Sequence, residues 1–110
     1  MINFERAEKA AEFIRDHAEQ YGKLIGLCKS LEHQRKVVYG QSFLEAKGGT
    51  VAEREAKAHI SPEFKSIIED IENSWADKET LATQIKAAEL TIELYRSGNA
   101  AAKRIEASHR

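Results

Sequence analysis

The sequence predicts an all-α protein in which two long antiparallel helices form a coiled-coil hairpin. Three observations lead to this fold class. The 110 residues include one Pro and six Gly and are 32% charged, a composition typical of long helices. Apolar or small side chains recur at steps of three and four residues through both halves of the chain. Two adjacent glycines separate the halves, so we expect one helical-hairpin domain over residues 1–110.

The first helix is predicted over residues 3–47, a stretch without Pro or a cluster of turn residues. Its stripe of apolar and small side chains consists of Ala7, Ala10, Ala11, Ile14, Ala18, Tyr21, Leu24, Ile25, Cys28, Leu31 and Val38. Positions seven residues apart recur within the stripe, as in a coiled-coil core. Gly22 and Gly26 each cost about 1 kcal/mol of helix propensity relative to Ala. A closely packed backbone against these two glycines would explain their presence.

The segment after residue 47 combines a turn with the start of a short helix. Gly48 and Gly49 provide a left-handed end to the first helix. Thr50 and Glu53 match a capping box, in which each side chain accepts a hydrogen bond from the other residue's backbone N–H. This pattern predicts a Gly-Gly turn followed by a short helix over residues 51–58.

A second long helix is predicted over residues 62–106. Ser61 is a favourable N-cap, Pro62 suits the first helical position, and the helix dipole favours Glu63 in the first turn. The apolar stripe of this helix consists of Phe64, Ile67, Ile68, Ile71, Trp75, Lys78, Leu81, Ala82, Ile85, Ala88, Ile92 and Tyr95. Its steps match those of the first helix, so we expect the two stripes to pack together.

Self-association is expected because a layer of two helices buries little apolar surface. A second apolar row widens the stripes and consists of Phe13, Leu27, Leu44, Ile60 and Leu94. We predict an oligomer interface at Tyr21, Ile25, Trp75 and Tyr95, because one facing helix cannot cover them all. The hairpins would then assemble into a homo-oligomer, a dimeric helical bundle.

No catalytic, cofactor-binding or metal-binding residues are predicted, and the chain is not expected to be an enzyme. Its carboxylates show no pattern that gathers them in an apolar pocket. Cys28 has a core position without a histidine within one helical turn, so its expected role is packing. His17 is expected on the packed side of the first helix as a hydrogen-bonded or half-exposed residue. The only Glu-x-x-His motif, Glu106 to His109, lacks the second such motif that a di-iron bundle needs.

The chain is expected in the cytoplasm. A single cysteine excludes an internal disulfide, and the N-terminal residues lack the pattern of a signal peptide. No apolar run approaches the roughly 20 residues of a membrane span. We therefore expect no membrane partner.

Basic side chains are unevenly distributed, although the net charge is only -1. They gather at the hairpin tip, where Tyr39 and Phe43 lie nearby, and in the C-terminal tail. Single-stranded nucleic acid binds cationic tracks that also offer aromatic stacking surfaces. The residues predicted to contact it are Lys29, Arg35, Lys36, Lys47, Arg54, Lys57, Lys103 and Arg104.

Four segments resemble a group of small helical bacteriophage proteins that are often encoded among phage DNA recombination and replication genes. These segments are QSFLEA at 41–46, TVAEREA at 50–56, SPEF at 61–64 and KAAELTIELYRS at 86–97. The resemblance implies a phage or prophage origin, a location in the host cytoplasm, and a role comparable to mediators that load a recombinase onto single-stranded DNA. It supplies no catalytic residues.

The expected function is therefore that of a non-enzymatic accessory protein in phage DNA recombination, with single-stranded DNA or a recombination protein as its partner. The alternative is a protein-binding inhibitor of a host defence system or nuclease. In that case the acidic helix face at residues 66–80 would occupy a basic groove of the target. Salt-dependent binding to oligonucleotides separates these two functions, because only phosphate contacts release counterions.

Overall fold

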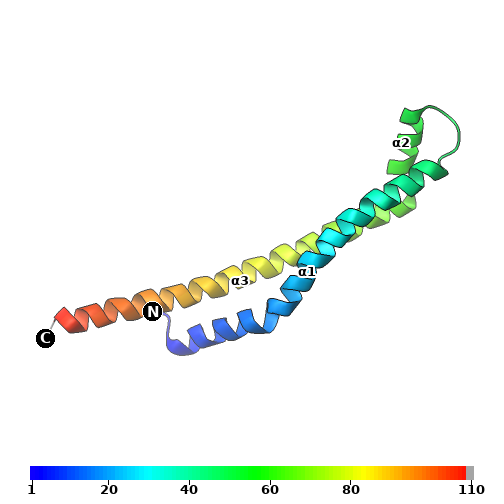
Figure 1. Cartoon of the computed structure of the whole chain (residues 1–110). Coiled ribbons are helices and arrows are strands. Elements are labelled where there is room, and N and C mark those ends of the chain that lie inside the picture. The colour runs from blue at the N-terminus through cyan, green and yellow to red at the C-terminus, as the bar shows by residue number, and fades with distance from the viewer. Residues whose placement is uncertain (109–110) are drawn as a thin grey trace. The chain divides into compact units, whose positions relative to one another are not determined.

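The computed structural model describes residues 1–108 and confirms the all-α fold class. Helix α1 spans Phe4–Glu45, α2 spans Val51–His59 and α3 spans Pro62–Ser108 (Figure 1). No strand occurs in this part of the chain. Each helix begins and ends within two residues of its predicted bound, a difference no larger than the usual fraying of helix ends.

The chain divides into two compact units. The first, called the hairpin unit here, is Gly22–Lys78 and contains the second part of α1, all of α2 and the start of α3. The second, the terminal unit, joins Met1–Tyr21 to the chain from Glu79 onward. In each unit a segment of α1 packs against a segment of α3.

The backbone at the turns follows the predicted capping signals. Gly48 and Gly49 have φ values of 72° and 82°, the left-handed conformation that ends α1. The backbone N–H of Glu53 donates to Thr50 Oγ1 over 3.2 Å, which caps α2. A side chain at Gly49 would overlap the flexible Glu53 carboxyl group, which could move aside, so the φ value is what requires glycine at this position.

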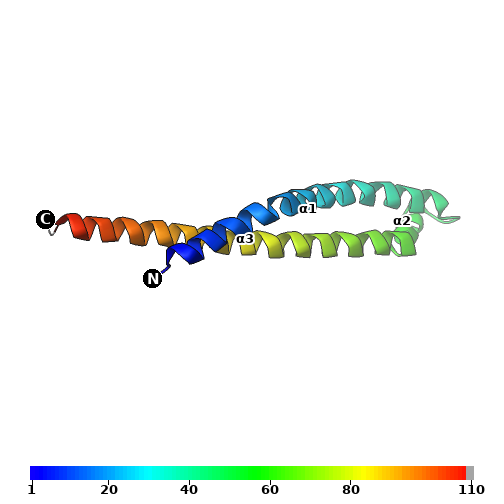
Figure 2. The same cartoon turned by 90° about the horizontal axis from the view of Figure 1, so that it is seen from below.

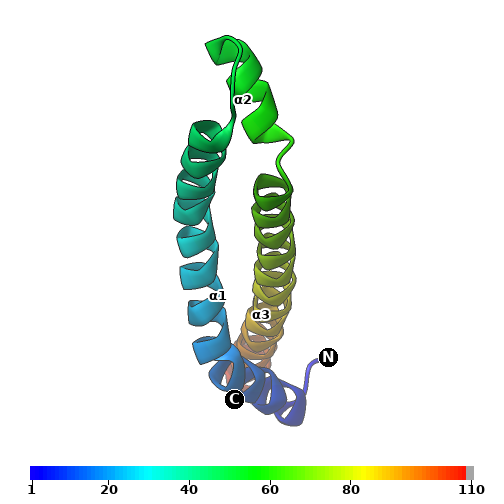
Figure 3. The same ribbon diagram turned by 90° about the vertical axis from the view of Figure 1, so that its right-hand side faces the viewer.

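The core of the hairpin unit lies between α1 and α3, which run side by side in Figures 2 and 3. Leu31 of α1 packs with Ile67 and Ile71 of α3, and each of the three exposes 9% or less. Cys28 is 4% exposed, which confirms its predicted packing role, and its thiol lies 3.5 Å from the hydroxyl of Ser74. Burial of these side chains joins the two helices across the hairpin.

A strict alternation of three- and four-residue steps describes the packed side of both long helices, which we call the seam. In α1 the seam consists of Ala7, Ala10, Ile14, His17, Tyr21, Leu24, Cys28, Leu31, Arg35, Val38 and Ser42. In α3 it consists of Phe64, Ile67, Ile71, Ser74, Lys78, Leu81, Ile85, Ala88, Ile92 and Tyr95. All these residues are buried or half-buried, as the coiled-coil pattern requires.

Three assignments to the predicted stripes are wrong. Ala11 and Ala18 are exposed, and Trp75 exposes 42% of its surface. The strict alternation places His17 on the packed side instead of Ala18, and Ser74 instead of Trp75. A stripe defined by apolar residues passes over polar residues that the helix period turns inward.

The terminal unit has a thinner core. Its buried side chains are Ala7, Ala10, Leu81 and Ala88. The rings of Phe4 and Tyr95 meet edge to face with centroids 6.0 Å apart, and the Met1 side chain lies beside Gly98. His17 behaves as predicted: it is half-buried, and its Nδ1 lies 2.8 Å from the carbonyl oxygen of Phe13. Small residues in the seam leave this unit with little apolar burial.

Gly26→Ala is expected to raise the free energy of unfolding by about 1 kcal/mol. Within this chain no backbone lies close to the two glycines, because a Cβ atom at Gly22 or Gly26 would meet nothing within 4 Å, and a partner's backbone there stays a prediction. Alanine would therefore restrict the unfolded chain without a clash in the helix. Urea denaturation followed by circular dichroism measures the effect. A loss of stability would contradict this open environment and point to another molecule's backbone against this face.

Candidate nucleic-acid interface

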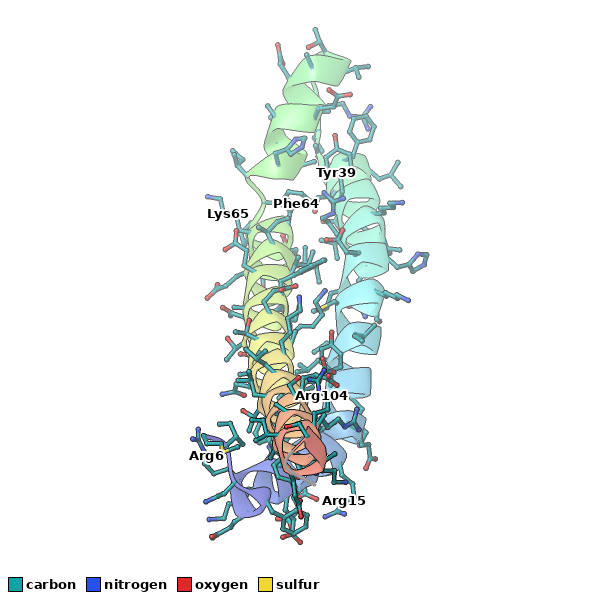
Figure 4. All side chains as sticks on the ribbon, turned by 90° about the vertical axis from the view of Figure 1, so that its left-hand side faces the viewer. Arg6, Arg15, Tyr39, Phe64, Lys65 and Arg104 are labelled. Atoms are coloured by element: carbon teal, nitrogen blue, oxygen red, sulfur yellow. The ribbon has the colours of Figure 1, made fainter. Side chains whose placement is uncertain are left out.

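A hollow of about 300 Å³ lies in the hairpin unit where the three helices meet. We call it the aromatic hollow. Arg35, Lys36 and Tyr39 of α1 line one side, and His59 of α2 and Phe64 of α3 line the other. Figure 4 shows Tyr39 and Phe64 between α1 and α3. Residues from three elements thus converge on one site.

Three rings in the hollow contact one another. The ring centroids are 4.9 Å apart for Tyr39 and His59, 5.8 Å for Tyr39 and Phe64, and 5.4 Å for His59 and Phe64. The two contacts of Phe64 are edge to face, a favoured aromatic geometry. His59 is exposed, while Tyr39 and Phe64 are half-buried. Because the rings hold one another, the stacking surface is formed before a ligand binds.

Local hydrogen bonds hold the ring of His59 and the backbone of Phe64. His59 is the last residue of α2, and its Nδ1 lies 2.8 Å from the carbonyl oxygen of Glu55. A carbonyl only accepts, so Nδ1 carries the hydrogen, and Nε2 of the neutral ring is left as an acceptor. Phe64 lies in the first turn of α3, where its backbone N–H donates to Ser61 Oγ over 3.2 Å. The hollow therefore depends on how α2 ends and α3 begins.

Two cations border the rings. Arg35 occupies a seam position and is half-buried, with its Nε 3.4 Å from a carboxylate oxygen of Glu32. This pairing holds the guanidinium group and offsets part of its charge. Lys36 is exposed and presents its ammonium group to solvent. The edge of the hollow formed by α1 is thus positive.

Two other predicted contacts serve the end of α1 instead. Arg54 Nη2 donates to the carbonyl oxygen of Phe43 over 3.4 Å, and its guanidinium group lies 4.6 Å from the Phe43 ring. Lys57 Nζ donates to the carbonyl oxygen of Lys47 over 2.9 Å. α1 has no basic residue in its last turn. α2 therefore supplies the cations that the negative end of α1 favours.

The remaining predicted contacts do not line the aromatic hollow. Lys29 borders a second hollow beside Trp75, and Lys47 is exposed in the connector after α1. Lys103 and Arg104 are exposed near the end of α3 in the terminal unit (Figure 4). Of the predicted cations, the structure brings Arg35 and Lys36 to the hollow.

The contributions of His59 and Phe64 were missed by sequence reasoning. The sequence places Phe64 in the apolar stripe and His59 in the mildly basic tip, without predicting a contact for either. A signal was present, because the two residues flank the turn at residues 60–61 and a tight turn brings its flanking residues together. The position of Tyr39 opposite this turn required the register between α1 and α3.

The predicted oligomer interface is divided between the two units. Tyr21, Ile25 and Tyr95 are half-buried within their own chain. Trp75 is exposed, with Lys78 Nζ 3.5 Å from its ring centroid. Four members of the second apolar row are exposed, namely Leu27 at 46%, Leu44 at 76%, Ile60 at 65% and Leu94 at 52%. These exposures leave apolar surface for a partner, and the interface itself stays a prediction.

The acidic segment at 66–80 contributes to another hollow of the hairpin unit, with a volume of about 290 Å³. Its lining residues are Leu27, Leu31, Asp70, Asn73, Ser74 and Asp77. Two carboxylates beside an exposed leucine suit a ligand that is both basic and apolar. This hollow is the feature that bears on the alternative function.

Within residues 1–108, no group of three His, Cys, Asp or Glu side chains is arranged to hold a metal ion. His109 of the Glu-x-x-His motif lies outside the described residues. None of the helices described here is long and apolar enough to cross a membrane.

No family model matches the chain, and neither a curated protein nor a solved structure was found to match it.

Proposed function

We propose that the chain is a non-enzymatic interaction protein that binds single-stranded nucleic acid at the aromatic hollow. The observation that carries this proposal is the set of three mutually packed rings with two cations along one edge. Every nucleobase has a flat π-face that stacks on aromatic rings, and the phosphates of a strand seek cations. The hollow offers both within one site.

The size of the hollow sets the length of the contact. About 300 Å³ lies at the lower end of ligand sites, so the hollow takes one base with its neighbouring phosphates. A single such contact binds modestly. A homo-oligomer with two hollows would hold a longer strand more tightly, because the second contact forms within the same complex.

The wider role we propose is that of an accessory factor in phage DNA recombination, located in the host cytoplasm and acting beside a recombinase or its single-stranded substrate. The resemblance to small phage proteins supports this role. An accessory factor must release the strand to the next protein, and modest, salt-dependent binding suits that task.

The test is fluorescence anisotropy with a labelled oligothymidine at several salt concentrations. Wild-type affinity is expected to fall with salt. In Arg35→Gln/Lys36→Gln, the slope of log K against log salt should become shallower by about 1.4, because each phosphate contact on a single strand contributes about 0.7. Lys36→Gln, at an exposed site, should show half of this change. Lys65→Gln is the matched control, since Lys65 is exposed on the side of α3 that faces away from α1 (Figure 4).

The same assay tests the stacking surface. His59→Ala is expected to weaken binding by roughly 5- to 100-fold with an unchanged salt slope, because it removes a stacking partner and no phosphate contact. No binding at 50 mM salt, or equal losses in the Lys65 control, would contradict the proposal. The alternative function would then rest on the acidic hollow, whose basic protein partner would be sought instead.

A further inference from the structure

The part of α3 in the terminal unit carries a second apolar face outside the seam. This outer stripe consists of Leu90, Leu94, Gly98, Ala101 and Ile105. Its three large side chains expose between 52% and 60% of their surface. At 3.6 residues per turn, the outer stripe lies about a third of a turn away from the seam. A second helix can therefore lie against it without displacing α1, but the Met1 side chain, which lies against Gly98, would have to move aside.

The end of α3 extends past the start of α1. α1 begins at Phe4, whose ring meets Tyr95, and the Met1 side chain reaches Gly98. α3 continues to Ser108, so its last ten residues lie beyond α1 (Figure 1). α1 does not reach this segment, so α1 leaves its apolar side uncovered. Ile105 in this segment is 60% exposed.

The accessible surface is large for the mass of the chain. It measures 8186 Å². A compact monomer of 12.4 kDa is expected to expose about 6,100 Å². The excess of about 2,000 Å² exceeds the roughly 800 Å² that each partner buries in an interface of standard size. The chain therefore exposes enough surface to bury an interface of standard size.

We propose that a second copy of this chain covers the outer stripe, with the two α3 helices antiparallel. A twofold axis level with residues 97–98 sets Leu94 against Ala101 of the second copy, and Leu90 against Ile105. Small residues surround the axis, because Ser97 of each copy lies against Gly98 of the other. The overhanging end of each α3 then packs on the preceding turns of the other.

The charges of α3 select the antiparallel direction. Residues 79–93 contain three Glu and one Lys, whereas residues 99–108 contain one Lys, one Arg and one Glu. In the antiparallel pair residues 87–93, which contain two Glu, lie along residues 102–108 of the other copy, which contain Lys103 and Arg104, although Glu89 is then level with Glu106. A parallel pair would place like charges together, which opposes association.

The first test is the mass in solution. Sedimentation equilibrium is expected to give twice the 12.4 kDa chain mass at micromolar concentration. Leu94→Glu should raise the dissociation constant about 100-fold or more, because a central apolar contact is lost twice in a symmetric interface. Leu44→Glu is the matched control, at a site that is 76% exposed in the hairpin unit, and should leave the dimer intact. A wild-type monomer, or a dimer that survives Leu94→Glu, would overturn the proposal.

The second test fixes the direction of pairing with a short bismaleimide cross-linker. Ser97→Cys should give a covalent dimer, because the two copies meet at this level. Ile105→Cys should not, since its two counterparts lie about 20 Å apart in the antiparallel pair. The wild-type chain controls for Cys28, which is 4% exposed. Cross-linking of both variants would show a parallel pair and refute the arrangement proposed here.

Discussion

Ile71→Asp is expected to lower the free energy of unfolding by roughly 3–5 kcal/mol and to melt the hairpin unit. Ile71 is 9% exposed and belongs to the cluster formed with Leu31 and Ile67. The aspartate would remove most of the apolar side chain and bring a carboxylate among apolar neighbours. The carboxylate would lose its hydration without gaining a hydrogen-bond partner, so this desolvation penalty adds to the free-energy cost of the cavity. Urea denaturation followed by circular dichroism measures the change.

Two variants on the same helix calibrate this result. Glu72→Lys changes an exposed neighbour and should alter stability by no more than about 0.5 kcal/mol. Ile85→Asp should fall between the two, because Ile85 occupies the seam but is half-buried. If Ile71→Asp and Glu72→Lys gave the same unfolding curve, the core would not lie between these faces of α1 and α3.

The helix bounds could be predicted because their signals are local. Left-handed glycines, a hydroxyl cap or a proline at the first helical position each act within one turn of the helix end. The positive φ values of Gly48 and Gly49 and the cap from Thr50 depend only on their immediate neighbours. For this reason the all-helical architecture followed from the sequence.

The polar residues within the seam could not be predicted from such local signals. Ser74 is 4% exposed while the neighbouring Trp75 is 42% exposed, against the order of their hydrophobicity. The helix period decides which of the two faces α1, and a small serine fits where the thiol of Cys28 also lies. Lys78 then covers the outward tryptophan ring at 3.5 Å. Apolar character was a weaker guide here than the strict alternation of steps.

Only part of the candidate site could be predicted, because tertiary contacts decide which residues line it. Sequence reasoning placed a mixture of cations and aromatic residues at the hairpin tip, and Arg35 and Lys36 do line the hollow. It could not tell them from Arg54, which binds the Phe43 carbonyl near the end of α1, and Lys57, which binds the Lys47 carbonyl in the connector. Which cations stay available is decided by contacts across the turn. Those contacts depend on how the three helices pack, and the packing cannot be predicted from amino-acid composition.

The junction between α2 and α3 depends on one hydroxyl group. Ser61 Oγ lies 2.9 Å from the carbonyl oxygen of Ala58 and 3.0 Å from the hydroxyl of Ser42, and it accepts from the N–H of Phe64. A hydroxyl has one hydrogen, and a carbonyl can only accept. Ser61 therefore donates to Ala58, and Ser42 donates to Ser61. Ser42 is 7% exposed and part of the seam, so this network joins all three helices.

Ser61→Ala is accordingly expected to cost roughly 2–3 kcal/mol of unfolding free energy, more than the loss of an ordinary cap. It removes the N-cap of α3 and leaves the buried hydroxyl of Ser42 without its acceptor. Thr50→Ala, which removes only an exposed cap from α2, should cost about 1 kcal/mol.

The double variant Ser42→Ala/Ser61→Ala should lose less than the sum of the single changes, because removal of both hydroxyls leaves no buried group unpaired. Urea denaturation of the four chains gives this coupling energy. Strict additivity would show that the two hydroxyls act independently and that Ser61 is only a cap. A coupling energy different from zero would show that the two hydroxyls act together at the junction of the three helices.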